Sequence, residues 1–154
     1  MEPGRTTEPT YYNSSYRHGV DDKRRIQIPA KWRPLKEEIE FTLILWPKSM
    51  EGPCIRVMPP KAMAKLMQDI DVMPNSDPNK GAFKRFIGGK SVQADVDKAG
   101  RVCLPDKMAK EAGITDEAVL VGLLDRFEIW SPDRYEKVEA SDAIMAHEAF
   151  KLME

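Results

Sequence analysis

The chain has 154 residues, which is enough for one ordinary domain or for two small ones that share a core. Its 42% hydrophobic content excludes wholesale disorder, and its formal net charge of −1 excludes a nucleic-acid binder that is basic overall, although a local basic face is compatible with it. We expect a cytoplasmic protein, because the first 15 residues lack a signal-peptide run and no apolar stretch approaches the ~18 residues of a membrane span.

The apolar pattern divides the chain into two similar units. Each unit reads as strand, strand, short helix, strand, strand, helix, with turn residues between the elements. The predicted organisation is an extended or disordered tail over 1–11, a first repeat over 12–72, a connecting loop and helix over 73–89, a second repeat over 90–140 and a C-terminal helix over 141–154. The sequence therefore predicts an α+β fold.

Two helices are predicted after the last strand of the first repeat. The first begins at Pro60, and its apolar side chains follow the spacing of one helical face, which favours core packing over a partner groove: Met63, Leu66, Met67 and Ile70. The second begins at Asp77-Pro78 and ends at Gly88-Gly89. We expect this second helix to pack between the two repeats.

A shift of 76 residues places the second repeat on the first, which indicates a duplication. Val20-Asp21 falls on Val96-Asp97, Arg25 falls on Arg101, and Ile28-Pro29 falls on Leu104-Pro105. Further along the chain the offset drops to 72, which implies a loop four residues shorter in the second copy. In each copy the first two strands read as a hairpin, and Gly100 permits the positive φ of the second hairpin's turn.

The sequence offers few groups for catalysis. Neither His18 nor His147 has a metal ligand at a suitable spacing, and Gly88-Gly89-Lys90 lacks the upstream glycine of a phosphate-binding loop. Cys54 and Cys103 lie in apolar runs, so we interpret both as small buried side chains. We therefore predict no enzymatic activity, no metal and no cofactor.

The basic residues gather around the two predicted hairpins. Residues 17–33 contain six basic and two acidic side chains, residues 80–110 contain eight basic and three acidic ones, and the chain after residue 110 is acidic. A single basic run is usually only a solvated face. Two such runs at equivalent places in a repeat favour a positive surface that contacts a polyanion.

The motif Asp-x-x-x-Arg occurs once in each copy, as Asp21 with Arg25 and as Asp97 with Arg101. Across a tight turn the two side chains can meet, and an exposed ion pair of this kind contributes only a few tenths of a kcal/mol. The same pair could also hold the arginine rigid, so that it donates two hydrogen bonds to guanine or clamps a phosphate. The two interpretations are compatible.

The segment from Val96 to Pro105, with the strands that follow it, resembles the hairpin signature of MraZ proteins, and the first copy resembles the paired N-terminal signature. The resemblance implies two AbrB-like (SpoVT-AbrB) hairpin halves that form one pseudo-twofold, barrel-like unit with flanking helices. It also implies ring-shaped homo-oligomers that bind repeated promoter boxes upstream of the division and cell-wall gene cluster. The DNA-contact residues that we predict from the resemblance and the charges are Asp21, Lys23, Arg24, Arg25, Asp97, Lys98 and Arg101.

The first copy departs from the family pattern at one position. The family favours glycine before the arginine of the motif, and the second copy has Gly100 there, whereas the first has Arg24. If the first turn also needs a positive φ, Arg24 costs about 1 kcal/mol in the left-handed region. Two other functions fit the same fold: an AbrB-type antitoxin that binds a toxin protein and its own promoter, and an oligomeric scaffold that binds no DNA.

Overall fold

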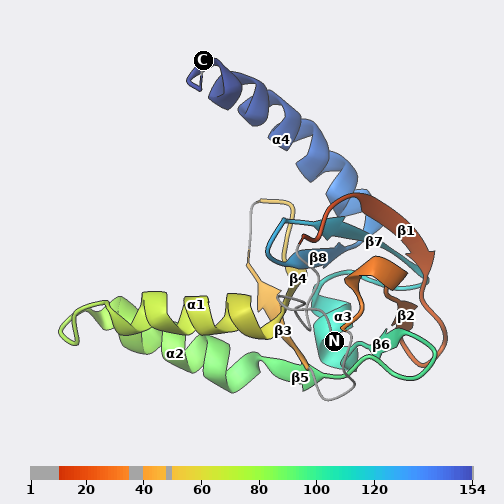
Figure 1. Cartoon of the computed structure of the whole chain (residues 1–154), viewed down its shortest axis with the longest axis horizontal. Helices are drawn as coiled ribbons and strands as arrows, with labels where there is room; N and C mark the ends of the chain where they lie inside the picture. Colours follow the sequence, from red (N-terminus) through yellow and green to blue (C-terminus); the bar gives the residue numbers. More distant parts are fainter. Residues whose placement is uncertain (1–10, 35–39, 48–49, 154) are drawn as a thin grey trace, which may run out of the picture.

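The computed structural model describes residues 11–34, 40–47 and 50–153. The first copy contains β1 (Ser15–Gly19), β2 (Arg25–Gln27), the short 3-10 helix η1 (Ala30–Trp32), β3 (Phe41–Trp46), β4 (Cys54–Met58) and α1 (Pro60–Asp71). After α2 (Pro78–Lys90), the second copy contains β5 (Val92–Ala94), β6 (Arg101–Cys103), α3 (Asp106–Glu111), β7 (Glu117–Gly122), β8 (Phe127–Trp130) and α4 (Pro132–Lys151). The predicted α+β class and the order of elements in each copy are confirmed (Figure 1).

The strands of the two copies are interleaved. Within the described residues they form a six-stranded sheet in the order β1-β7-β8-β4-β3-β5 and a separate two-stranded sheet of β2 and β6, which we call the β2/β6 ribbon. All neighbouring strands are antiparallel. The first strand of each copy pairs with the third strand of the other, as β1 with β7 and β5 with β3. Neither copy therefore completes its sheet alone.

This pairing corrects the two predicted hairpins. In the first copy, β1 and β2 come together only near their turn, where Val20 bridges Ile26 and the Asp21 N–H donates to the Arg25 carbonyl. The main partner of each return strand lies in the other copy, since β2 pairs with β6. If each strand of the large sheet is replaced by its equivalent in the other copy, the strand order is the same read from the opposite edge. The unit therefore has an approximate twofold axis. The helix α2 breaks this symmetry, because it has no equivalent in the other copy.

The main core joins the ribbon to the large sheet. Ile26 of β2 and Val102 of β6 are fully buried and belong to the same apolar cluster as Leu43 and Leu120 of the large sheet. Trp32 packs against Phe127 with ring centroids 4.8 Å apart, which ties η1 to the last strand of the other copy. The ribbon is therefore held on one side by packing, while its other side faces outward.

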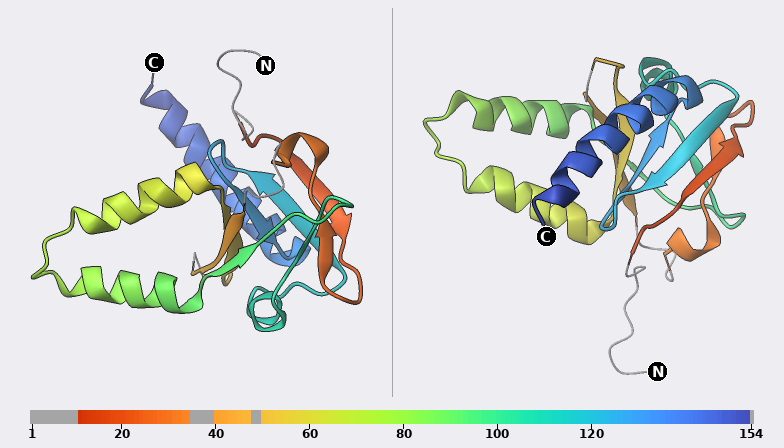
Figure 2. Two further views of the ribbon diagram at one scale, coloured as in Figure 1. Left: turned by 60° about the horizontal axis from the view of Figure 1, so that its bottom comes forward. Right: turned by 90° about the horizontal axis from the view of Figure 1, so that it is seen from above.

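The helices α1 and α2 run side by side and form an arm that points away from the sheets (Figures 1 and 2). The prediction that α2 packs between the two repeats is wrong, because α2 packs mainly against α1 and β3, which both belong to the first copy. The predicted stop at Gly88-Gly89 is also wrong, since the helix continues to Lys90. On α1, Ile70 is buried as expected, whereas Met67 is exposed.

The last helix is longer than the sequence predicts. A helix that begins after Ser131 and a separate helix from residue 141 are joined in the continuous α4, which leaves the sheet in a different direction from the arm (Figure 1). The Ser131 side chain accepts a hydrogen bond from the Arg134 N–H and caps the first turn, as expected for a serine before a proline. Of the helices in the described ranges, none has both the length and the apolar character to cross a bilayer.

Candidate nucleic-acid interface

The β2/β6 ribbon presents four side chains on its outer face. Its register pairs Arg25 with Cys103, Ile26 with Val102 and Gln27 with Arg101. Successive side chains of a strand point to opposite faces. Because the central pair is buried in the core, the four flanking side chains lie together on the outward face: Arg25, Gln27, Arg101 and Cys103.

Each arginine of this face is held by the aspartate that starts its turn. Asp21 Oδ1 accepts the backbone N–H groups of Lys23 and Arg25 at 3.0 and 2.8 Å, and its Oδ2 accepts Arg25 Nε at 2.7 Å. Asp97 makes the same three contacts, from the N–H groups of Ala99 and Arg101 at 2.9 Å each and from Arg101 Nε at 3.2 Å. One carboxylate thus both shapes the turn and orients the arginine.

The two motifs, 76 residues apart in the sequence, lie side by side. Arg101 Nη1 is 4.0 Å from Asp21 Oδ2, so this carboxylate faces the arginines of both copies. The side chains of Arg25 and Arg101 are 31% and 32% exposed to solvent. Since each aspartate holds the Nε edge, the terminal Nη groups are the ones that can donate to a ligand.

Hydrogen bonding keeps both aspartates ionised. The backbone N–H of Arg25 is the main cause that lowers the pKa of Asp21 below its ordinary value, and the Arg25 side chain and the Lys23 N–H act in the same direction. For Asp97 the backbone N–H of Arg101 is again the largest cause that lowers the pKa, followed by the charge of the guanidinium. Ionised carboxylates are the form that accepts charge-assisted hydrogen bonds from arginine.

Arg24 adopts the same backbone conformation as Gly100. Their φ angles are +60° and +82°, and the backbone N–H of each donates to the carbonyl of the aspartate three residues earlier at 2.9 Å. The Arg24 side chain offsets part of this strain, because its Nε donates to the Leu104 carbonyl at 3.1 Å. At Gly100, the space above the Cα is filled by the guanidinium of Arg33. The predicted positive φ of Gly100 is confirmed, and the departure at Arg24 leaves the turn geometry intact.

Two further predicted residues lie at the tips of the turns. Lys23 and Lys98 are both exposed beside the ribbon, one in each turn, although the 76-residue shift places Lys23 on Ala99 and Lys98 on Asp22. The interpretation of Cys103 as a buried side chain is wrong, because it is exposed on the ribbon opposite Arg25, whereas Cys54 is buried in β4. Gln27 was not singled out from the sequence. Because Gln27 follows Arg25 by two residues in a strand, the sequence indicates that both side chains share a face. That this face also carries Arg101 becomes clear only from the register between the two copies.

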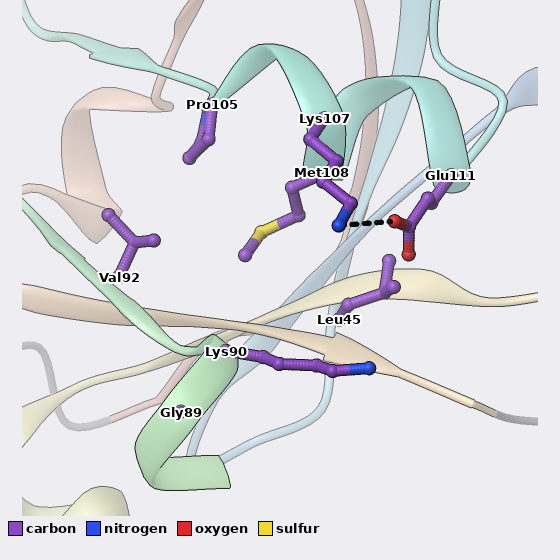
Figure 3. Close-up of a pocket in the computed structure, with 8 residues that line it drawn as sticks. All are labelled: Leu45, Gly89, Lys90, Val92, Pro105, Lys107, Met108 and Glu111. Carbon is purple, nitrogen blue, oxygen red and sulfur yellow. Dashed lines mark ion pairs between the residues drawn. The ribbon is translucent and has the colours of Figure 1, made fainter. Parts of the chain in front are cut away.

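A small pocket of about 240 Å³ lies apart from this face, between α3, the end of α2 and β3 (Figure 3). It is lined by Leu45, Gly89, Lys90, Val92, Pro105, Lys107, Met108 and Glu111. Lys107 Nζ and Glu111 Oε1 are 4.0 Å apart, and the lining contains no hydroxyl, thiol or imidazole that could act as a nucleophile or base. Across the described parts of the chain, no group of three or more His, Cys, Asp and Glu side chains is placed to hold a metal ion.

The chain is similar to proteins of known family. Residues 87–152 match the family model described as "MraZ protein, putative antitoxin-like". The chain is 36% identical over 135 residues to the Transcriptional regulator MraZ of Rickettsia felis, and the match covers 88% of this chain and 91% of the relative. Relatives of the same name in Rickettsia conorii and Rickettsia canadensis are 36% and 33% identical over the same length. With such identity over nearly the full length of these relatives, the chain belongs to the MraZ family.

Proposed function

We propose that this chain is a transcription regulator that binds specific DNA sequences through the β2/β6 ribbon. The observation that carries the proposal is the convergence of two Asp-Arg pairs on one outward face, although the pairs come from different halves of the sequence. A two-stranded ribbon fits the major groove of B-DNA, and arginine is the side chain that most often reads guanine there. A role in regulation accords with the names of the Rickettsia relatives.

The residues of the face divide into two tasks. Lys23, Arg24 and Lys98 attract phosphates and release counterions, which gives affinity that falls with salt but carries no sequence information. Arg25 and Arg101 read base edges. Asp21 and Asp97 are positioning residues, because their carboxylates fix the guanidinium groups before DNA arrives.

We further propose that the protein acts as a ring of identical subunits on repeated promoter boxes upstream of the division and cell-wall gene cluster, and so associates with the nucleoid. Linked weak contacts raise the overall affinity by ~10² to 10⁴ without any new contact type. This also reconciles DNA binding with a net charge of −1, since only one side of the assembly needs to be positive.

Two helices have the properties of subunit contacts in such a ring. α2 carries four basic and no acidic side chains, and α4 carries five acidic and three basic ones. Both also expose large apolar side chains, which include Phe83 on α2 and Ile144 and Phe150 on α4. Opposite charges and exposed apolar groups on different elements suit a head-to-tail contact, which closes into a ring when the rotation permits. Neutral substitution of Glu136 and Glu139 with unchanged ring size would count against a role of the acidic face of α4 in this contact.

The test is footprinting on the DNA upstream of the protein's own gene, with light scattering to size the free protein. In band-shift titrations, Arg101→Ala should weaken binding to the protected site by about 1–3 kcal/mol and relax its sequence preference. Lys98→Ala is the matched comparison, because it should weaken specific and random DNA equally and reduce the salt slope by about 1.

Wild-type affinity in the Arg101→Ala variant would refute base reading by this residue. A small nuclease captured by the protein would favour the AbrB-type antitoxin function, and the matched family model is itself described as antitoxin-like. Absence of any salt-dependent DNA affinity would favour the oligomeric scaffold.

A further inference from the structure

The outward face of the ribbon is symmetric in its arginines but not in the residues beside them. Arg25 and Arg101 are equivalent under the 76-residue shift, and the same shift places Gln27 on Cys103. The register therefore pairs Arg25 with a cysteine and Arg101 with a glutamine. One half of the face carries a carboxamide where the other half carries a thiol.

Gln27 and Cys103 are held in equivalent ways despite their different chemistry. Gln27 Nε2 donates to the Ala99 carbonyl at 2.8 Å, and the Cys103 thiol donates to the Lys23 carbonyl at 3.4 Å. Lys23 and Ala99 are themselves equivalent under the shift. Each side chain is thus tied to the opposite turn, so the difference between the two halves lies in the groups that the side chains offer to a ligand.

A carboxamide and a thiol offer different groups to a base pair. After one N–H of Gln27 has donated to Ala99, the amide has a second N–H donor and an oxygen acceptor, the pair that matches N7 and N6 of adenine. A cysteine behaves as a small apolar side chain with a weak donor, and small apolar groups contact the methyl group of thymine. Guanine reading by the two arginines would be the same in both halves.

We propose that Gln27 and Cys103 are specificity-determining residues that make the recognition face directional. The Arg101–Gln27 half reads a guanine next to an adenine, and the Arg25–Cys103 half reads a guanine without that adenine. This rests on the proposed function, because it assumes that the ribbon enters the major groove. An almost twofold protein unit then recognises a box that is not palindromic.

The test is selection of bound sequences from a randomised duplex library, followed by competition with single base-pair changes. The wild-type chain should select a motif without internal twofold symmetry. Gln27→Ala should lose about tenfold discrimination at one A·T pair and keep the guanine preferences. Cys103→Gln, which makes the two halves alike, should shift the selected motif toward a palindrome, a gain that a damaged fold cannot produce. Gln93→Ala on β5 is the matched control, because it removes an exposed strand glutamine from the other sheet and should select the wild-type motif.

The outcomes separate this inference from the proposed function. A palindromic wild-type motif, or a wild-type motif selected by both ribbon variants, would overturn the directional face while leaving sequence-specific binding in place. If the wild-type chain selects no motif at all, the proposed function fails and the inference fails with it.

Discussion

Replacing Arg24 by alanine and by glycine measures the cost of the first turn directly. Both substitutions remove the hydrogen bond from Arg24 Nε to the Leu104 carbonyl and the weak contact with Asp106 at 3.8 Å. They differ in the backbone, because alanine keeps a side chain at a φ of +60° whereas glycine adopts this conformation without steric cost. The difference between the two variants therefore isolates the strain.

The expected magnitude follows from opposing terms. A left-handed conformation costs a non-glycine residue about 1–2 kcal/mol. In the opposite direction, a glycine lowers the free energy of unfolding by about 0.4–1 kcal/mol relative to alanine, because the unfolded chain has more conformational freedom. Arg24→Gly should therefore exceed Arg24→Ala in free energy of unfolding by about 1 kcal/mol. Arg24→Ala should fall below the wild-type protein by about 1 kcal/mol, because it loses a hydrogen bond and relieves no strain.

Denaturant unfolding at equal protein concentration provides the measurement, and the two variants should also differ by about 2–4 °C in Tm. Lys23 supplies the control, since it is exposed in the same turn and its φ is not positive. At this position glycine should be no more stable than alanine. Equal stability of the alanine and glycine variants at position 24 would refute the left-handed turn and restore the alternative of a different geometry in the first copy.

Two more predictions concern charged pairs. Glu128→Ala should destabilise the fold by about 3–5 kcal/mol in denaturant unfolding, because the Glu128 carboxylate is 4% exposed and its loss leaves the Arg56 guanidinium buried without this partner. Glu117→Ala removes an exposed pair and should change the free energy of unfolding little. Since the folded pKa values of Asp21 and Asp97 are lowered, the stability that they contribute is present above their unfolded pKa of about 3.9 and is lost as the pH falls through the folded values. The stability gap between wild type and the double Asp→Asn variant should therefore shrink below about pH 4, and a gap that is constant between pH 7 and pH 3 would contradict this.

Much of the fold was predictable because its signals are local. A serine before a proline is a general signal of a helix start, and a glycine followed by an apolar residue is one of a helix end. In the fold, Ser131 accepts from the Arg134 N–H, and Gly113, which precedes Ile114, has a φ of +72°. The Asp-x-x-x-Arg motif could likewise be interpreted within one turn, since the hydrogen bonds that each aspartate side chain accepts come from residues two and four positions later. The sequence therefore predicted that each aspartate contacts its arginine, but it did not predict where either pair lies in the fold.

The pairing between copies could not be predicted in the same way. Alternation along residues 25–27 shows that Ile26 faces a core, but it does not identify the strand that lies beside it. A simple hairpin was the expected partner, whereas the structure pairs β2 with β6. For this reason Gln27 was missed and Cys103 was interpreted as buried, because their place beside the arginines depends on a register between residues about 76 positions apart.

The glycines of α2 failed as a stop signal for a related reason. Glycine costs a helix only about 1 kcal/mol relative to alanine, an amount that tertiary packing easily exceeds. Here Ile87 is buried against the apolar cluster between the arm and the sheet, and Phe86 packs against the same cluster. The positions above Gly88 and Gly89 face open space, so neither glycine is required by a close neighbour. The helix therefore continues to Lys90 and ends at Ser91, whose N–H still donates to the Ile87 carbonyl but whose backbone is extended, with φ −73° and ψ 154°.

The approximate twofold axis explains why the two copies belong in one chain. At the centre of the large sheet, β4 lies beside β8, and the equivalent positions of the two copies are occupied by Arg56 and Glu128. Their side chains pair at 2.8 Å, and Trp130 Nε1 donates to the second carboxylate oxygen at 3.0 Å. Two identical copies would place like charges opposite each other here, which destabilises a sheet. Opposite charges instead favour the pairing of unlike copies, and fusion in one chain supplies each copy with its unlike partner. The two copies also differ at Gln27 and Cys103, and fusion in one chain fixes which half of the ribbon carries each of these side chains. A directional DNA contact requires such a fixed arrangement.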